Sequence, residues 1–124
     1  MALAVLAVAS CAPAVQLPAH GPLGAVPTAL LTGRLTASGP CVYVEGVQQD
    51  RWLVIWPTGY QLVGDALVSG DRRVASLGDT VRLGGGEWPE GEFDSLRRLL
   101  VVPVPDACRG GDYWLSSGVL SGAP

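Results

Sequence analysis

Residues 29–46 read Ala-Leu-Leu-Thr-Gly-Arg-Leu-Thr-Ala-Ser-Gly-Pro-Cys-Val-Tyr-Val-Glu-Gly, and this stretch decides the fold. Two sets of side chains alternate along its first half: Leu31, Gly33, Leu35 and Ala37 against Leu30, Thr32, Arg34 and Thr36. That period of two is typical of a half-buried strand. Ser38-Gly39-Pro40 is a turn signal, and the second β-rich run 41–45 follows it. The stretch therefore predicts a β-hairpin.

Downstream, Arg51-Trp-Leu-Val-Ile-Trp56 is apolar on both faces, which predicts a central strand that is covered on each side. Further strands are expected at 60–68, 72–77, 80–83 and 113–119. Gly78-Asp79 suits a tight turn between two of them. The segment from Gly84 to Asp94 is expected to be a long loop.

The region after that loop has two possible structures. Asp94 or Ser95 is suited to cap a short helix over 96–100. The run 99–104 is equally compatible with a strand, which Pro103 and Pro105 would restrict to the edge of a sheet.

Short strands with turn signals every 8–12 residues predict an all-β fold, a small closed or partly open antiparallel β-barrel. A β-sandwich is the alternative. The initial hairpin, the Gly-Asp turn and the single short helix resemble the layout of oligonucleotide/oligosaccharide-binding (OB) barrels. The resemblance covers 29–120 and includes no diagnostic motif, and a fold alone does not fix a function.

Composition restricts the possible partners. The chain has 124 residues, a length typical of one domain, and a formal net charge of −3. All eight basic residues are arginine, and no basic run is present. This composition argues against a nucleic-acid partner.

The N-terminal segment differs from the rest of the chain. Residues 2–9 form an apolar run of signal-peptide length, and the first charged side chain is Arg34. Prolines from Pro13 onward prevent a helix from continuing, so the run is shorter than the ~20 residues needed to span a bilayer. We therefore expect a signal peptide over 1–10.

Val8-Ala9-Ser10-Cys11 resembles the lipobox of bacterial lipoproteins, although the usual Lys or Arg before the apolar run is missing. The resemblance implies cleavage after Ser10, acylation of Cys11 and anchoring to a membrane on the extracytoplasmic side of the bacterial envelope. A plain secretory signal and an uncleaved apolar terminus are the alternatives. Residues 11–28 would then form a Pro-rich extended tether, with His20 solvated in it, before a barrel domain over 29–120.

With Cys11 assigned to lipid, Cys41 and Cys108 remain, and an even pair in an exported domain predicts a disulfide. Two free buried thiols are the alternative. A metal site is less favoured because the chain has no CxxC spacing.

No catalytic residues are assigned from the sequence. Its single His lies in the expected tether, and a Gly-x-Ser-x-Gly elbow is missing. Glu87, Glu90, Glu92 and Asp94 are interpreted as a solvated acidic loop, with calcium as the alternative. Gly84–Gly86 lacks the Lys and Ser/Thr of a phosphate-binding loop. We expect neither a cofactor nor a metal.

The aromatic residues supply the remaining hypotheses. Tyr43, Trp52 and Trp56 are expected in the core, whereas Trp88, Tyr60 and Trp114 are candidates for a binding surface. The sequence thus favours a non-enzymatic envelope lipoprotein that acts through contacts with an envelope protein. A module that binds a saccharide or a cell-wall ligand is the alternative.

Overall fold

The computed structural model describes residues 14–25 and 27–122, and its strands are arranged in two sheets. The strands are β1 (Ala14–Gln16), β2 (Ala19–His20), β3 (Ala29–Ser38), β4 (Cys41–Glu45), β5 (Arg51–Pro57), β6 (Tyr60–Val63), β7 (Ala66–Ser69), β8 (Arg72–Ser76), β9 (Thr80–Trp88), β10 (Leu100–Val102) and β11 (Asp112–Gly122). The helical segments are the 3-10 turns η1 (Glu90–Glu92) and η2 (Asp106–Cys108) and the short helix α1 (Phe93–Arg97).

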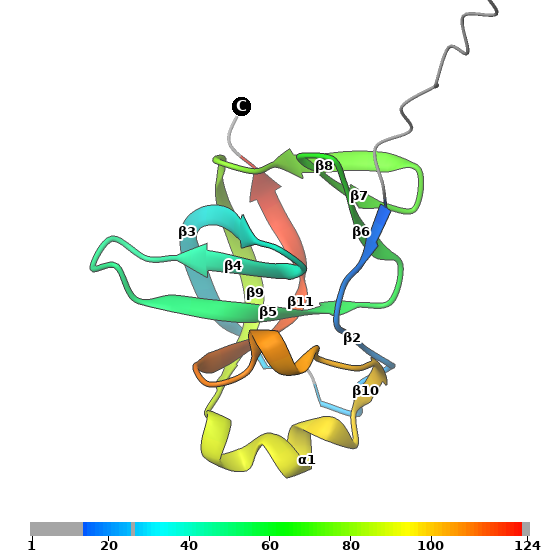
Figure 1. Ribbon diagram of the computed structural model, residues 1–124, viewed down its shortest axis with the longest axis vertical. Helices are drawn as coiled ribbons and strands as arrows, with labels where there is room; N and C mark the ends of the chain where they lie inside the picture. Colours follow the sequence, from blue (N-terminus) through cyan, green and yellow to red (C-terminus); the bar gives the residue numbers. More distant parts are fainter. Residues whose placement is uncertain (1–13, 26, 123–124) are drawn as a thin grey trace, which may run out of the picture.

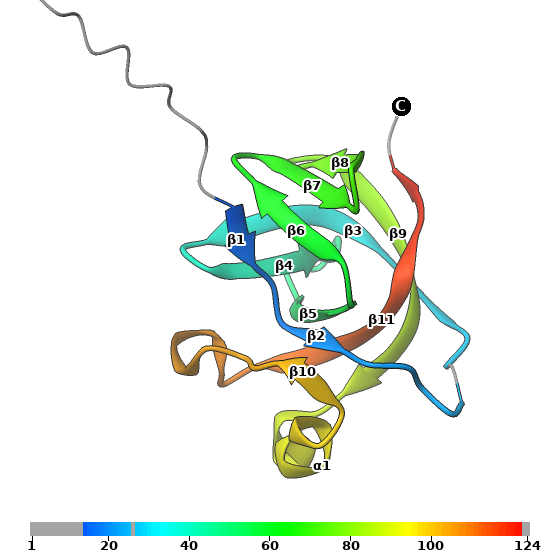
Figure 2. The ribbon, with the colours of Figure 1, turned by 90° about the vertical axis from the view of Figure 1, so that its right-hand side faces the viewer.

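Five strands close into a barrel in the order β5-β11-β9-β3-β4, and β4 pairs again with β5 (Figures 1 and 2). The β5–β11 pair is parallel, and the other pairs are antiparallel. The all-β barrel prediction is confirmed, and this strand order is consistent with the OB-like layout. The β3–β4 hairpin is also confirmed, with Arg34 opposite Glu45 and Ser38 opposite Cys41.

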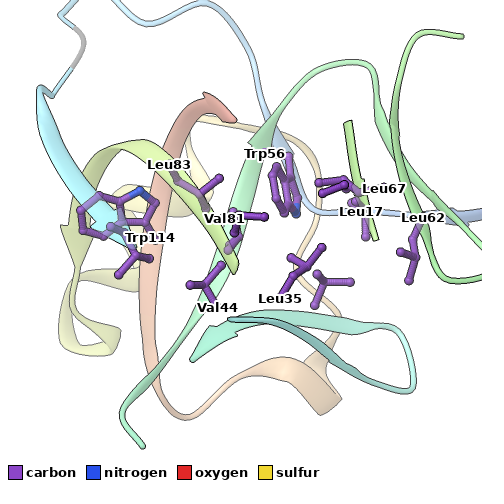
Figure 3. Close-up of a cluster of buried hydrophobic side chains, with 13 residues drawn as sticks. Leu17, Leu35, Val44, Trp56, Leu62, Leu67, Val81, Leu83 and Trp114 are labelled. Carbon is purple, nitrogen blue, oxygen red and sulfur yellow. The ribbon is translucent and has the colours of Figure 1, made fainter. Parts of the chain in front are cut away.

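The barrel interior is a close-packed apolar core (Figure 3). Alternate residues of the barrel strands point inward, among them Leu31 and Leu35 from β3, Val44 from β4, and Trp56 from β5. Trp56 and Leu35 are fully buried. Trp52 packs against the same cluster, so the predicted core positions of Trp52 and Trp56 are confirmed.

One end of the barrel is covered by the meander β6-β7-β8, which β1 extends to a fourth strand. Figures 1 and 2 show the meander at the opposite end from α1. The single weak strand expected over 60–68 is instead a hairpin whose turn contains Gly64 at φ 62°. Leu62 and Leu67 from this hairpin join the barrel core, which explains why the meander packs there.

The prediction of an extended tether over 11–28 is wrong for 14–20, so the folded domain begins before residue 29. Residues of β1 pair with β6, and β2 pairs with β5 and β10. Leu17 is 1% exposed, and the carbonyl of Pro18 accepts a hydrogen bond from the Trp56 amide at 2.9 Å. The prolines prevent a helix but not an extended strand, and here apolar burial holds that strand on the domain. The proposed signal peptide and Cys11 lie outside the described residues.

The long loop predicted from Gly84 is also wrong, because β9 continues to Trp88. The glycines lie beside β11, where Gly85 has a φ of 141° and Trp114 Nε1 donates to the Gly84 carbonyl at 3.1 Å. A Cβ on Gly85 would lie 2.8 Å from Trp114 Nε1 and would collide with the Leu115 carbonyl. The glycine run therefore permits close approach of two strands.

Between β9 and β11 the chain makes an excursion over the outside of the barrel, and we call residues 89–111 the cover. The predicted helix over 96–100 lies earlier, at Phe93–Arg97, and neither Asp94 nor Ser95 caps it. Its position is set by Phe93 and Leu96, which are both buried. The alternative strand exists as β10, which pairs with β2 and ends before Pro103.

Candidate functional site

The outer face of β4, β5 and β11 carries a second apolar cluster, separate from the barrel interior. The barrel contributes Tyr43, Leu53, Ile55, Tyr113 and Leu115, and the cover contributes Phe93, Leu96, Val104 and Cys108. The barrel wall is thus buried on both sides, as the apolar sequence of β5 predicted. Tyr43 shares this outer face with Cys41, also as predicted.

A disulfide between Cys41 and Cys108 fastens the cover to the start of β4. The two Cα atoms are 5.4 Å apart, and the bond closes a loop with a sequence separation of 67 residues. The predicted cysteine pairing is confirmed.

A polar cluster holds the two ends of the cover together. Arg109 donates to Glu90 Oε1 at 2.5 Å, and the Tyr113 hydroxyl donates to Glu90 Oε2. The Arg109 guanidinium also lies 3.8 Å above the Phe93 ring. The hydrogen bond from Tyr113 is the main cause that lowers the pKa of the Glu90 carboxyl, and Arg109 adds to this effect. Burial, followed by the bond to Glu90, raises the pKa of Tyr113 to about 12.

This raised pKa predicts a loss of stability at alkaline pH. Because folded Tyr113 keeps its proton up to about pH 12 while the unfolded residue loses it near 10.0, the folded state binds more protons within that interval. The free energy of unfolding should therefore decrease as pH rises through it. Urea titrations at successive pH values will measure the slope, and Tyr113→Phe should reduce it. An equal slope in the variant would contradict this role for Tyr113.

Beside the cover, on the same outer face, lies a pocket of about 230 Å³ that we call the β4–β5 pocket. Its lining includes Tyr43, Arg51 and Leu53 from the barrel and Cys108, Gly110 and Gly111 from the cover. Asp112, the exposed first residue of β11, also lines it and brings a carboxylate to the pocket.

Two arginines line the pocket, and Arg51 is the one that is not bound to a residue of the cover. Its guanidinium carbon lies 4.1 Å from the centre of the Tyr43 ring, a cation–π contact. Within residues 14–25 and 27–122, Arg51 forms no ion pair. The other pocket arginine, Arg109, is bound to Glu90. Among the described residues, the Arg51 guanidinium is therefore held on the Tyr43 ring without an ion-pair partner.

The three aromatic residues predicted to form a binding surface do not come together. Trp114 is 5% exposed in the barrel core, which corrects its assignment to a surface. Tyr60 stacks on Trp56 at 5.1 Å, and its hydroxyl accepts a hydrogen bond from the Val119 amide at 3.3 Å. Trp88 is half-buried against the outer cluster and donates to the Glu92 carbonyl at 2.8 Å. Each ring is thus engaged by the domain itself.

The expectation that His20 is solvated is also wrong, since His20 is 5% exposed. Its Nδ1 lies 2.7 Å from the Gly21 carbonyl oxygen, and its Nε2 lies 2.6 Å from that of Ser116. The ring thereby ties β2 to β11, at the edge of an apolar hollow of about 270 Å³.

The acidic residues interpreted as a solvated loop separate into two kinds. Glu87, Glu92 and Asp94 are exposed, whereas Glu90 is committed to Tyr113 and Arg109. In the described part of the chain, no group of three or more His, Cys, Asp or Glu residues is arranged to hold a metal ion.

A scan against protein-family models and searches of curated proteins and solved structures found no match to this chain. Over the residues that the structure describes, no helix is long and apolar enough to cross a membrane.

Sequence reasoning did not single out Arg51, Gly110 or Gly111. One usable signal was present: in a hairpin over 41–56, Arg51 lies on the same sheet face as Tyr43. Gly110 and Gly111 become neighbours of that face only through the disulfide and the Glu90 cluster, which join segments distant in sequence.

Proposed function

We propose that this chain is a non-enzymatic cell-envelope lipoprotein whose barrel binds a saccharide or another cell-wall ligand in the β4–β5 pocket. The observation that carries the binding role is the unpaired Arg51 guanidinium, stacked on Tyr43 in a concave site. The same outer face of the second and third barrel strands binds oligonucleotides or oligosaccharides in OB barrels, which adds support by fold analogy alone. The non-enzymatic part of the proposal is supported by His20, the one histidine of the chain, because both of its ring nitrogens contact backbone carbonyls that hold β2 in place.

The anchor is proposed at Cys11, on the lipobox-like sequence that precedes it. Ala14, three residues later, is already paired with Val63 in the meander. Three residues of extended chain span at most about 11 Å. An acylated Cys11 would therefore hold the meander end of the barrel close to the bilayer, without a long spacer. The cover, whose helix α1 lies at the opposite end from the meander, would be farther from the membrane (Figure 1).

The anchor and the ligand are tested separately. The mass of the intact protein purified from native membranes should equal that of residues 11–124 plus acyl groups, with Cys41 and Cys108 oxidised. A chain that begins at Met1 with an unmodified Cys11 would contradict the lipoprotein assignment.

For the ligand, the purified protein should cosediment with peptidoglycan. Substitution Arg51→Met should reduce the bound fraction, while Arg82→Met, at an exposed arginine of β9, should leave it unchanged. Equal sedimentation of both variants would exclude the pocket as the binding site.

A second candidate role, contact with an envelope protein, is favoured by a different surface. Leu30 and Leu120 are 48% and 63% exposed. Leu30 is paired with Gly84, and a Cβ on Gly84 would lie within 3.8 Å of Leu120, so the two leucines flank the same glycine. Site-specific crosslinking from position 30 in native membranes tests this role. A reproducible crosslink that Leu120→Ser abolishes would support it, and no crosslink would count against it.

A further inference from the structure

We infer that the β4–β5 pocket recognises the carboxylate of a single sugar-acid unit through Arg51. The inference rests on the proposed ligand-binding role of the pocket and adds the chemical class of the ligand. Three features of the pocket lead to it: the position of Arg51, the two glycines in the lining, and the volume.

The first feature is how Arg51 is held. It is the first residue of β5 and is exposed, yet its guanidinium carbon lies over the Tyr43 ring, 4.1 Å from the ring centre. Tyr43 itself is only 9% exposed, so the ring is a fixed platform. Among the described residues the guanidinium N–H groups of Arg51 have no hydrogen-bond partner, and a planar carboxylate can accept hydrogen bonds from two of these groups at once. Because the side chain is already positioned, binding costs less conformational entropy.

The second feature is that two neighbouring residues of the lining, Gly110 and Gly111, carry no side chain. Gly110 has a φ of 113°, a conformation that favours glycine, and Gly110 and Gly111 expose peptide groups in place of side chains. Such groups can hydrogen-bond sugar hydroxyls.

The third feature is size. The pocket volume of about 230 Å³ is below the roughly 300–1,000 Å³ of pockets that enclose drug-sized molecules. A pocket of this volume has room for one sugar ring but not for several linked sugar rings. Three carboxylates lie near the proposed ligand: Glu45, directly opposite Arg51 on β4, Asp50, the residue before Arg51, and Asp112, which lines the pocket. None is within ion-pair distance of Arg51 in the described residues, but all three oppose an anionic ligand.

The test uses D-glucuronate and its neutral counterpart D-glucose as probes, read by ¹H–¹⁵N NMR of the full chain. Glucuronate should shift the amides of Gly110 and Gly111 and the Arg51 Nε–H signal, and glucose should bind at least about tenfold more weakly. A hydrogen bond to a charged group contributes about 1.5–3 kcal/mol. Arg51→Met should therefore weaken glucuronate binding by about 10- to 100-fold.

Two matched variants separate charge from general damage. Arg82→Met should leave glucuronate affinity unchanged, and Glu45→Gln should raise it because one repelling carboxylate is neutralised. Unshifted amides elsewhere in the Arg51→Met spectrum establish that this variant is folded.

Each other outcome overturns the inference. Equal affinity for glucose and glucuronate would mean a saccharide pocket without carboxylate recognition, which leaves the proposed function intact. A peptide with a free C-terminal carboxylate, N-acetyl-Ala-Ala, that binds more tightly than glucuronate through Arg51 would replace the sugar acid with a peptide end. If no probe shifts any NMR signal of the protein, sugar acids are excluded as ligands of the pocket. The proposed function would then still be tested separately by cosedimentation with peptidoglycan.

Discussion

Replacing Cys41 and Cys108 together by alanine should lower the free energy of unfolding by about 4 kcal/mol. The disulfide closes a loop with a sequence separation of 67 residues, and the chain-entropy model gives that magnitude for a loop of this length. A domain of this size has a total stability of about 5–15 kcal/mol, so the loss is a large share of it. The cover should be affected first, because Cys108 is its attachment to β4.

Chemical denaturation of the oxidised protein and of the double variant measures this difference. Adding a dithiol reductant should bring the wild-type unfolding midpoint to that of the variant and should leave the variant unchanged. A difference below about 1 kcal/mol would mean that the bond adds little constraint to the unfolded chain, contrary to this prediction.

Substitution Gly85→Ala should destabilise the barrel by about 3 kcal/mol or more, the sum of backbone strain and steric overlap. At its φ of 141° an alanine is strained, and its Cβ would collide with the Leu115 carbonyl and come within 2.8 Å of Trp114 Nε1. The β9–β11 pairing cannot widen at this point without disturbing the Trp114 hydrogen bond to Gly84.

Gly91→Ala is the matched control for this substitution. A Cβ on Gly91 meets nothing within 4 Å, and the residue lies in the exposed turn η1. Its effect on the free energy of unfolding should stay within about 0.5 kcal/mol. Comparable losses in the two variants would show that the close approach at Gly85 carries no special cost.

Local patterns predicted the barrel well. Alternation in 30–37 and the turn at 38–40 depend only on neighbouring residues, and the β3–β4 hairpin they predicted is present. The doubly apolar run 51–56 became the strand that is buried on both faces. The Cys41–Cys108 pairing was predictable because the chain has three cysteines and, once Cys11 was assigned to lipid, only these two could form a disulfide.

The errors have a common physical cause, which is that tertiary contacts override local signals. Glycines at 84–86 indicate a loop unless another strand must approach closely, as β11 does. Prolines near His20 indicate a free tether unless apolar neighbours such as Leu17 can be buried. The pocket was not predictable for the same reason, because Arg51 and Gly111 meet only in the folded chain.

The cover has a consequence for the shape of any polymer that this domain could recognise. A long strand laid across β4 and β5 would collide with α1 and with the segment that ends at Cys108, both of which already occupy that wall. What remains accessible is a recess at the margin of the wall, beside Arg51. If the proposed ligand binding holds, recognition there would be end-on: a terminal unit or a side branch would enter, and the internal repeats of a polymer would stay outside.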